Sequence, residues 1–235
     1  IRKSGGSKLS SVRVMDQGKP SSRPEIANAN RLKIVGGTAK GRKIDSPDVY
    51  LRPMMAKVRE ALFSSLNSMH IFEGGNCRVL DVFSGSGSVG LEALSRGASH
   101  TTFVDFSAEC CTTALRNAES LGFSGQASAV TATALDVLRR PAQYNMQRTY
   151  DLVSLTPPYE EIDYSELLQA VWESPLVAAD TVVAFEYPAE LPKLSYVLGE
   201  DKLFGLRSRR YGRTILAIYV YRPTTHLDMR PDEFA

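Results

Sequence analysis

Three glycines follow a short apolar segment at a spacing that suits an adenosine-type cofactor. Residues Val79–Phe83 lead into Gly85, Gly87 and Gly90, which form a G-x-G-x-x-G pattern. Glycine allows the backbone to turn tightly and a ligand to approach it closely. Asp105 follows twenty positions after Gly85, where a carboxylate can accept hydrogen bonds from the hydroxyls of a ribose. The pattern therefore predicts NAD or S-adenosylmethionine as the cofactor.

Asp81 bears on the choice between these two cofactors. Dinucleotide binding needs a free helix N-terminus for the pyrophosphate, whereas S-adenosylmethionine carries an ammonium and a sulfonium that favour nearby acceptors. The Asp81 carboxylate lies just before the glycine loop and would supply a negative charge there. Its alternative role is to accept hydrogen bonds from the amides of the loop itself. The glycine pattern alone leaves both cofactors open.

A second motif, Thr156-Pro157-Pro158-Tyr159, directly follows the apolar segment Asp151–Leu155. Ligands of open α/β sheets bind at the end of the sheet where such strands finish. Consecutive prolines stiffen the turn and leave the preceding carbonyls without internal donors, so these carbonyls can accept hydrogen bonds from an exocyclic amine. Tyr159 offers a flat face on which a base can stack. The alternative is a rigid loop whose tyrosine belongs to the core.

The elements that must position these motifs alternate between strand and helix, which is typical of a parallel sheet covered on both faces. The sequence predicts strands at Arg78–Phe83, His100–Phe106, Gln126–Thr131, Tyr150–Leu155 and Thr181–Glu186, and helices at Met55–Asn67, Val89–Ser95, Ala108–Leu121, Leu135–Arg139 and Tyr164–Trp172. Two further strands, Leu203–Tyr211 and Arg213–Tyr221, meet at Gly212 and predict a hairpin. Before all of these, Leu32–Ile44 predicts two short strands around a glycine turn.

The 235-residue chain has a net charge of only +2, but the charge is unevenly distributed. Residues 1–59 hold 14 Lys and Arg against 4 Asp and Glu, a balance of +10, whereas residues 60–235 hold 14 against 22, a balance of −8. This asymmetry predicts a basic arm that meets a polyanion. A basic tail that binds nothing is the alternative. The expected phosphate contacts are Lys40, Arg42, Lys43, Arg52 and Arg59, with Arg210 from a second cluster that also holds Arg207, Arg209 and Arg213.

Two classes of protein are disfavoured by the composition. No uncharged apolar run reaches the roughly 18 residues that a membrane span requires. Cys77, Cys110 and Cys111 lack the C-x-x-C spacing of a structural zinc site, and their odd number argues against a disulfide framework. We therefore expect neither a membrane partner nor a metal.

From Leu32 to Tyr221, about 190 of the 235 residues, the sequence resembles the RsmD-type methyltransferases. The resemblance is carried by Ile34–Gly37, Gly41–Lys43, Leu51–Pro53, Val58–Phe63, Leu80–Gly87, Gly90–Ala98 and Pro157–Tyr159. It implies a Rossmann-like class I methyltransferase fold with a seven-stranded, mostly parallel sheet and an antiparallel C-terminal hairpin. It also implies methyl transfer from S-adenosylmethionine to the exocyclic N2 amine of a guanine in small-subunit ribosomal RNA.

The resemblance assigns roles to particular residues. Thr156 and the Pro157 carbonyl would orient the target amine, with Pro158 stiffening the turn and Tyr159 stacking on the base. The amine lies at a base edge, so the guanine must be unpaired or turned out of its stack. The cofactor would be held by Asp81, Phe83, Ser84, Gly85, Gly87, Asp105, Phe106 and Thr133.

Two positions depart from the family pattern. The family has Asp or Asn before Pro-Pro-Tyr, and this chain has Thr156. A threonine hydroxyl has acceptor lone pairs but is smaller and uncharged. The family also places an Asp after the third strand, where this chain has Thr133, with Asp136 three residues later as a substitute. Both departures bear on the rate of the reaction more than on the fold.

The predicted organisation has four segments. They are a disordered basic segment (1–30), an RNA-binding extension (31–70), an S-adenosylmethionine-dependent methyltransferase domain (71–223) and a C-terminal tail (224–235). Residues 1–30 are rich in Arg and Ser and poor in acids, which is typical of organelle transit peptides, with a disordered linker as the alternative. We therefore expect an organellar protein, in a chloroplast ahead of a mitochondrion, with the cytoplasm of a bacterium as the alternative.

The expected partner is small-subunit ribosomal RNA or the assembling small subunit, and the expected oligomeric state is a monomer. The main alternative function is an rRNA-binding assembly factor that keeps the fold but has lost turnover through Thr156. A methyltransferase for another amine, such as adenine N6 or a protein glutamine, is a third hypothesis. A nicotinamide-dependent oxidoreductase is the fourth.

Overall fold

The computed structural model describes residues 32–49, 53–159, 162–225 and 227–235. Segment 1–30 and Arg52, for which predictions were made above, lie outside the described residues. The strands are β1 Arg78–Val82, β2 His100–Asp105, β3 Ala127–Thr131, β4 Tyr150–Leu155, β5 Val177–Pro188, β6 Val197–Leu198, β7 Leu203–Tyr211 and β8 Thr214–Tyr221. The α-helices are α1 Ala56–Ser68, α2 Ser88–Ser95, α3 Ala108–Leu121, α4 Ala134–Arg139 and α5 Tyr164–Glu173, with short 3-10 turns at Ser124–Gln126, Pro141–Tyr144 and Pro231–Phe234.

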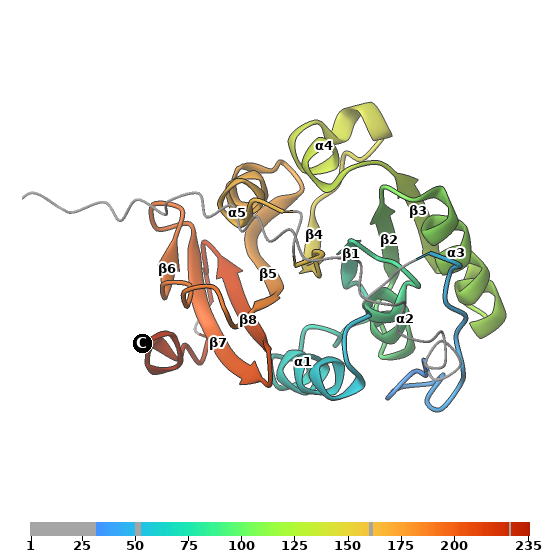
Figure 1. The fold of residues 1–235 in the computed structure, drawn as a ribbon, viewed down its shortest axis with the longest axis horizontal. Coiled ribbons are helices and arrows are strands. Elements are labelled where there is room, and N and C mark those ends of the chain that lie inside the picture. Colours follow the sequence, from blue (N-terminus) through green and yellow to red (C-terminus); the bar gives the residue numbers. More distant parts are fainter. Residues whose placement is uncertain (1–31, 50–52, 160–161, 226) are drawn as a thin grey trace, which may run out of the picture.

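The strands form one sheet in the order β3-β2-β1-β4-β5-β8-β7-β6 (Figure 1). Strands β1 to β5 pair in parallel, whereas β8 runs antiparallel to both β5 and β7. This is the predicted parallel sheet with an antiparallel C-terminal hairpin. The sheet has eight strands where seven were expected, because Val197–Leu198 adds a two-residue strand on the outer edge of β7. So short a strand carries no alternating pattern that the sequence could have revealed.

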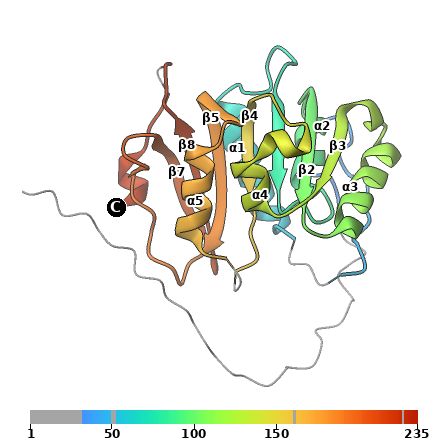
Figure 2. The ribbon, with the colours of Figure 1, turned by 90° about the horizontal axis from the view of Figure 1, so that it is seen from above.

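Helices cover both faces of the sheet, as Figures 1 and 2 show. Helices α1, α2 and α3 pack over one face, against side chains such as Val79 and Phe103. Helices α4 and α5 pack over the other, against Leu80 and Val153. Adjacent residues of one strand point to opposite faces, so the apolar run of β1 supplies both cores. A strand buried on both sides is expected to read as continuously apolar.

Local signals in the sequence set the helix boundaries. Ser107 caps α3 by accepting a hydrogen bond from the Cys110 amide, and Gly122 ends that helix in a left-handed conformation with φ of 87°. Asp163 caps α5 by accepting from the amides of Ser165 and Glu166. Because these signals are local, the predicted bounds of α3 match the structure and those of α5 differ by one residue.

The segment before α1 differs from the prediction of two short strands. Only one isolated antiparallel bridge, between Lys33 and Lys43, is present in its described part. The segment docks instead on α2, where the Glu92 carboxylate accepts hydrogen bonds from the Val35 and Gly36 amides, each at 2.7 Å. Contacts with a helix 57 residues away therefore hold this segment together with its own backbone hydrogen bonds, such as those from the Ile34 amide to the Arg42 carbonyl and from the Ile44 amide to the Leu32 carbonyl, each at 3.0 Å.

Gly37 is the tightest point of this docked segment, which leads to a testable prediction. Its φ is +75°, and an added Cβ would lie 1.9 Å from the Ser95 carbonyl oxygen. We expect Gly37→Ala to lower the free energy of unfolding by about 3 kcal/mol, measured by urea denaturation. Gly41→Ala is the matched control, because Gly41 has φ of +82° but open space around it. Equal losses in the two variants would contradict the docked arrangement.

The C-terminal residues pack against the sheet edge. Phe234 is 6% exposed, and its ring lies 5.2 Å from that of Tyr219 in an edge-on arrangement. The Glu233 carboxylate accepts a hydrogen bond from the Ser208 amide of β7 at 2.8 Å. The segment predicted as a tail thus covers part of β7.

Candidate active site

The carboxyl ends of three neighbouring strands meet at one edge of the sheet. Val82 of β1 is in register with Val104 of β2 and with Leu155 of β4. The residues that follow these strands, which include the glycine loop and Thr156, therefore lie side by side. This edge is where parallel α/β sheets bind ligands.

The glycine loop leaves β1 through a strained backbone. Phe83 has φ of 63°, in the left-handed region that non-glycine residues rarely adopt, and Gly85 and Gly87 follow at 52° and 79°. Strain of this kind is of order 1–3 kcal/mol per residue and collects at functional sites. Gly90 serves packing, because a Cβ there would lie 2.4 Å from Thr101 and 2.5 Å from Phe103 of β2.

Asp105, at the end of β2, holds the glycine loop. One carboxylate oxygen accepts a hydrogen bond from the Gly85 amide at 2.9 Å, and the other accepts from the Ser107 amide at 3.0 Å. Each carboxylate oxygen has a second lone pair. The same carboxylate can therefore fix the loop and accept hydrogen bonds from a ribose.

Asp81 has one engaged and one free oxygen. Its Oδ2 accepts a hydrogen bond from the Gly90 amide at 2.8 Å, which is the loop-capping role that the sequence left open. Its Oδ1 is buried and has no hydrogen-bond partner in the described part of the chain. Burial raises the pKa of this carboxyl to about 7, against the opposing effect of the Gly90 hydrogen bond. The site thus holds an acceptor that a cationic ligand could stabilise in its charged form.

The raised pKa of Asp81 predicts a pH dependence of stability. The folded protein holds this proton up to about pH 7, whereas the unfolded chain releases it near 3.8. The contribution of this carboxyl to the free energy of unfolding is therefore fully present at low pH. It falls by at most about 1.4 kcal/mol per pH unit as the pH rises from 4 through 7. Urea denaturation at pH 5, 6, 7 and 8 should show wild type losing stability relative to Asp81→Asn up to about pH 7. If the stabilities of the two proteins change with pH in parallel, the raised pKa of Asp81 is contradicted. His100, whose pKa is lowered by burial, also contributes to the pH dependence, but it does so equally in both proteins.

The Thr156–Tyr159 turn lies against the glycine loop. The Thr156 amide donates to the Val82 carbonyl at 3.4 Å, and its hydroxyl donates to the Phe83 carbonyl at 3.2 Å. Pro157 is buried, while Pro158 is exposed. The structure therefore brings together the two motifs that the sequence singled out, although they lie about seventy residues apart.

Two residues expected to hold the cofactor, Phe106 and Thr133, lie at the same edge of the sheet. Phe106, directly after β2, is 72% exposed. Thr133 caps α4, where its hydroxyl accepts from the Asp136 amide at 3.2 Å and donates to the Asp136 carboxylate at 2.7 Å. The Thr133 hydrogen bond, together with one from Arg140, lowers the pKa of the Asp136 carboxyl. Thr133 and Asp136 thus act as one unit at this position.

The residues at this edge fit an adenosyl cofactor. The Ser84 hydroxyl is buried and has no partner among the described residues, like the Asp81 Oδ1 atom. Asp105 can accept from ribose hydroxyls, and the exposed ring of Phe106 offers a surface for a base. The set combines unused polar atoms with an apolar surface, as adenosine-binding sites require.

The predicted phosphate contacts of the N-terminal extension divide into two groups. Lys40 and Lys43 are exposed. Arg42 is also exposed, but its guanidinium donates to the Ser120 and Leu121 carbonyls at the end of α3 that is remote from the glycine loop. The prediction for Arg59 was wrong, because this side chain is 1% exposed and its Nε lies 3.7 Å from the Glu92 carboxylate. A buried guanidinium cannot contact RNA, and Arg59 is paired with Glu92 instead.

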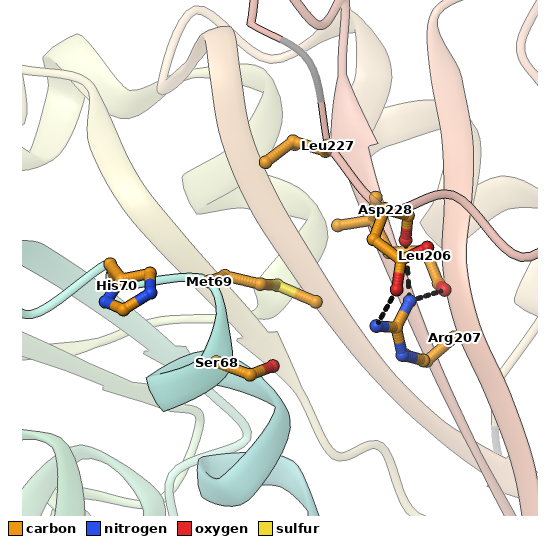
Figure 3. Close-up of a pocket in the computed structure, with 7 residues that line it drawn as sticks. All are labelled: Ser68, Met69, His70, Leu206, Arg207, Leu227 and Asp228. Carbon is orange, nitrogen blue, oxygen red and sulfur yellow. Dashed lines mark hydrogen bonds and ion pairs between the residues drawn. The ribbon is translucent and has the colours of Figure 1, made fainter.

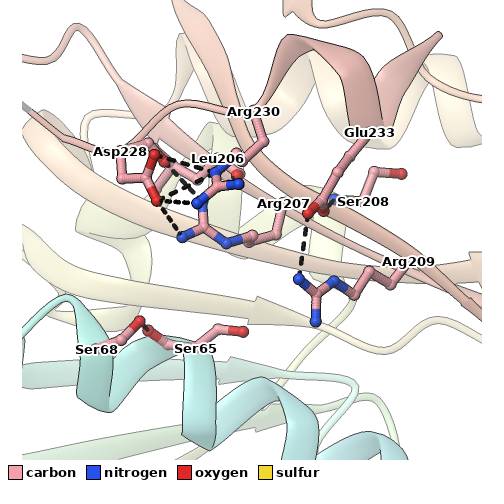
Figure 4. A network of polar contacts seen from close by, with 9 residues as sticks. All are labelled: Ser65, Ser68, Leu206, Arg207, Ser208, Arg209, Asp228, Arg230 and Glu233. Carbon is pink, nitrogen blue, oxygen red and sulfur yellow. Dashed lines mark hydrogen bonds and ion pairs between the residues drawn. The ribbon is translucent and has the colours of Figure 1, made fainter.

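Most arginines of the C-terminal hairpin pair with acids. Figure 4 shows Arg207 with Asp228 and Arg209 with Glu233, and Arg213 lies 2.8 Å from Glu190. Arg210 donates to the Gly212 carbonyl and, in the described part of the chain, has no acid within ion-pair distance. Because β7 runs parallel to β5, its end carries Arg210 to the same edge of the sheet as the glycine loop. Arg210 is thus the best-placed cation of its cluster for a phosphate.

The cavity shown in Figure 3 lies apart from these motifs. It has a volume of about 380 Å³ and opens between the end of α1 and β7, where Arg207 and Asp228 line it. Arg207 is already paired there, with its Nη2 3.0 Å from the Asp228 carboxylate. Within the described ranges, no helix is long and apolar enough to cross a membrane, and no cluster of His, Cys, Asp or Glu is arranged to hold a metal.

Comparison with known proteins places the chain. A family model described as "Conserved hypothetical protein 95" matches residues 32–220. The chain belongs to this family. A relative within it, "Putative rRNA methyltransferase YlbH" of Bacillus subtilis, is 31% identical over 192 residues, covering 81% of this chain and 100% of that protein. "Ribosomal RNA small subunit methyltransferase D" of Escherichia coli is 28% identical over 188 residues, covering 78% and 90%.

The solved structures support the same family assignment and fold. "Putative methyltransferase yhhF from Escherichia coli" superposes with a TM-score of 0.66 at 25% identity, over 81% of this chain and 97% of that one. A hypothetical protein of Thermus thermophilus gives 0.65 at 27%, over 79% and 97%. The expectations of an RsmD-type family member and of a class I methyltransferase fold are therefore confirmed.

Sequence reasoning missed the residues that hold the glycine loop and the Thr156–Tyr159 turn from outside these two motifs. Glu92 of α2 docks the N-terminal extension. Asn117 of α3 donates to the Ser86 carbonyl at 3.0 Å and to the Asp45 carbonyl at 2.9 Å, joining the glycine loop to that extension. Glu186 and Thr214 contact the Tyr159 hydroxyl. The sequence held a signal for Glu92 alone, because the resemblance to the family extends past the glycines through Ala98.

Proposed function

We propose that this chain transfers a methyl group from S-adenosylmethionine to the N2 amine of a guanine in small-subunit ribosomal RNA. The observation that carries the proposal is the contact of the Thr156–Tyr159 turn with the glycine loop. A cofactor bound at the glycine loop and an amine bound at the Thr156–Tyr159 turn would then lie close together. The names of the relatives support a ribosomal RNA substrate, and S-adenosylmethionine is the cofactor expected of this family and fold.

The geometry of Thr156 suits an acceptor. Bound S-adenosylmethionine would supply an electrophilic methyl group. Because the Thr156 hydroxyl gives its hydrogen to the Phe83 carbonyl, its oxygen presents only lone pairs to other groups. It can thus accept one hydrogen of a guanine N2 amine while the Pro157 carbonyl accepts the other. Threonine here performs part of the role that Asp or Asn would perform.

Positioning is the main requirement of such a methyl transfer. Donor carbon and acceptor nitrogen about 3–3.5 Å apart and in line recover several kcal/mol of the barrier. Hydrogen bonds that draw both amine hydrogens to one side free the nitrogen lone pair from the ring. Tyr159, half-buried beside this turn, would stack on a guanine turned out of its helix.

The test is a methyl-transfer assay with a radiolabelled cofactor on small-subunit RNA and on assembling particles. We expect Thr156→Val to lower the rate about tenfold through loss of one hydrogen bond. Thr156→Ser should retain the rate, and Thr156→Asn should match or exceed wild type. Mass spectrometry of the product should locate the methyl group on guanine N2, and a methyl group on adenine N6 would contradict the proposal.

An inert wild type that still binds RNA tightly would favour the assembly-factor alternative. Phosphate contacts give binding that weakens steeply with salt. We expect Arg210→Gln to weaken RNA binding and to flatten its salt dependence.

Residues 1–30 are also proposed to direct the chain to an organelle, with a bacterial cytoplasm as the alternative. Imaging of this segment fused to a fluorescent protein in plant cells tests the chloroplast assignment.

A further inference from the structure

A polar cluster on β5 and β8 holds the hydroxyl of Tyr159. This hydroxyl lies 2.6 Å from the Thr214 Oγ1 atom and donates to the Glu186 carboxylate at 3.1 Å. Thr214 is 0% exposed and Glu186 is 7% exposed. The antiparallel register pairs Glu186 with Leu216, two residues after Thr214, so both side chains lie on the same face of the sheet. The catalytic turn is therefore fastened to two strands outside it.

Burying a carboxylate at this position is costly unless it is well satisfied. A hydrogen bond from a phenol to a charged acceptor is stronger than one between neutral groups. Neither Glu186 nor Thr214 is adjacent in sequence to the glycine loop or to the Thr156–Tyr159 turn. Their side chains contact the site through the Tyr159 hydroxyl. Their shared feature is the contact with this one hydroxyl.

The ring orientation of Tyr159 depends on this contact. A tyrosine ring is set by two side-chain torsions. Anchoring the hydroxyl oxygen fixes the first, but this oxygen lies on the rotation axis of the second. The ring plane is therefore set by the directions of the two hydrogen bonds, to Glu186 and Thr214, because a phenol hydroxyl favours partners near the plane of its ring. A displacement of about 1 Å at a reacting centre can cost up to 10²-fold in rate. Supporting residues that lock a functional side chain supply this precision.

We propose that Glu186 and Thr214 are positioning residues, which fix the ring of Tyr159 at the orientation needed to stack on the target base. The inference rests on the proposed function for its consequence in catalysis. It commits Tyr159 to a defined pose before RNA binds. It also assigns to the end of β5 and the start of β8 a role in the reaction that neither motif reveals.

The first test is a double-mutant cycle in the methyl-transfer assay. Tyr159→Phe and Thr214→Val should each lower kcat about tenfold, and the double variant should be no slower than Tyr159→Phe alone. Thr214→Ser, which keeps the hydroxyl, should restore the wild-type kcat. The dissociation constant for S-adenosylhomocysteine, measured by calorimetry, should stay within twofold of wild type in all four. Losses that multiply in the double variant would overturn the inference.

Thr181→Val is the matched control. Thr181 is a buried threonine at the other end of β5, and its hydroxyl donates to the Tyr150 carbonyl at 2.7 Å. Its removal should lower stability as much as Thr214→Val does and leave kcat unchanged. An equal fall in kcat for both variants would show that the effect is general loss of structure, which contradicts a positioning role.

A second readout does not depend on turnover. Fluorotyrosine placed at position 159 should give one narrow fluorine resonance in wild type and in Thr181→Val. Thr214→Val and Glu186→Gln should broaden or split it, because the ring is freed. An unchanged resonance would overturn the inference even if the enzyme is active. If the wild type is inert but gives the expected resonances, the proposed function is contradicted, whereas the inference that Glu186 and Thr214 fix the Tyr159 ring is supported.

Discussion

Replacing Glu92 with alanine is expected to lower the free energy of unfolding by about 3–5 kcal/mol, a large part of the stability of a domain of this size. Glu92 is 0% exposed and faces Arg59, which is 1% exposed. Burial lowers the pKa of the Arg59 guanidinium, and the Glu92 carboxylate opposes that effect. Removing the carboxylate leaves a buried charge without its partner, which is the costly way to break such a pair. The measurement is urea denaturation.

The cause can be separated from general damage to α2. Glu119→Ala on the exposed side of α3 is the control and should change stability by no more than about 0.5 kcal/mol. Arg59→Met combined with Glu92→Gln removes the unpaired charge and should recover part of the loss. If the double variant is as unstable as Glu92→Ala, the unpaired charge is not the cause. The lost contacts of Glu92 with the Val35 and Gly36 amides and with Arg96, whose guanidinium lies 2.8 Å from the carboxylate, would then account for it.

The sequence predicted the elements around the site well because their signals are local. The glycine turn at Gly85 and Gly87, the cap at Ser107 and the tight turn at Gly212 each act within a few residues. The hairpin at Gly212 and the parallel strands before it give the fold class. Strand β6 was missed because two residues are too few to show the alternation of apolar and polar side chains that marks a strand.

The arrangement of charges was less predictable than the fold. Arg59 lies among basic residues, where a solvated or RNA-bound side chain is the natural expectation. Its burial follows from Glu92, 33 positions later, which itself lies in a helix whose eight residues are all buried. No local pattern reports a contact of that range. The same holds for Glu186 and Thr214, whose roles become visible only once β5 and β8 pair.

The chemistry of the site was predictable in part. The spacing from Gly85 to Asp105 predicts a ribose acceptor, which stays a prediction, and the structure shows that this carboxylate fixes the loop. Asp81 had two open interpretations, and the structure shows one oxygen on the Gly90 amide and one without a partner among the described residues. Such divided roles arise because a carboxylate has two oxygens and the sequence records only the residue.

Replacing Asp105 with asparagine is expected to weaken S-adenosylhomocysteine binding about 100-fold, which corresponds to about 2.8 kcal/mol. An asparagine has one acceptor oxygen where Asp105 has two, so its amide group must face the Gly85 or the Ser107 N–H. One backbone donor is then left unsatisfied, and the glycine loop loses its anchor. The ribose also loses an acceptor. Calorimetric titration with S-adenosylhomocysteine measures the change.

Asp180→Asn separates this effect from the loss of a carboxylate elsewhere. Asp180 also accepts from a backbone amide and a hydroxyl, both of Thr224, but it lies near the amino end of β4. It should lose stability and keep the wild-type affinity for S-adenosylhomocysteine, since nothing it holds touches the glycine loop. If Asp105→Asn binds S-adenosylhomocysteine with wild-type affinity, the ribose does not contact this carboxylate and the cofactor does not lie at the end of β2. Because the Thr156 hydroxyl contacts the Phe83 carbonyl at the start of the loop that Asp105 anchors, the methyl-transfer proposal depends on this affinity.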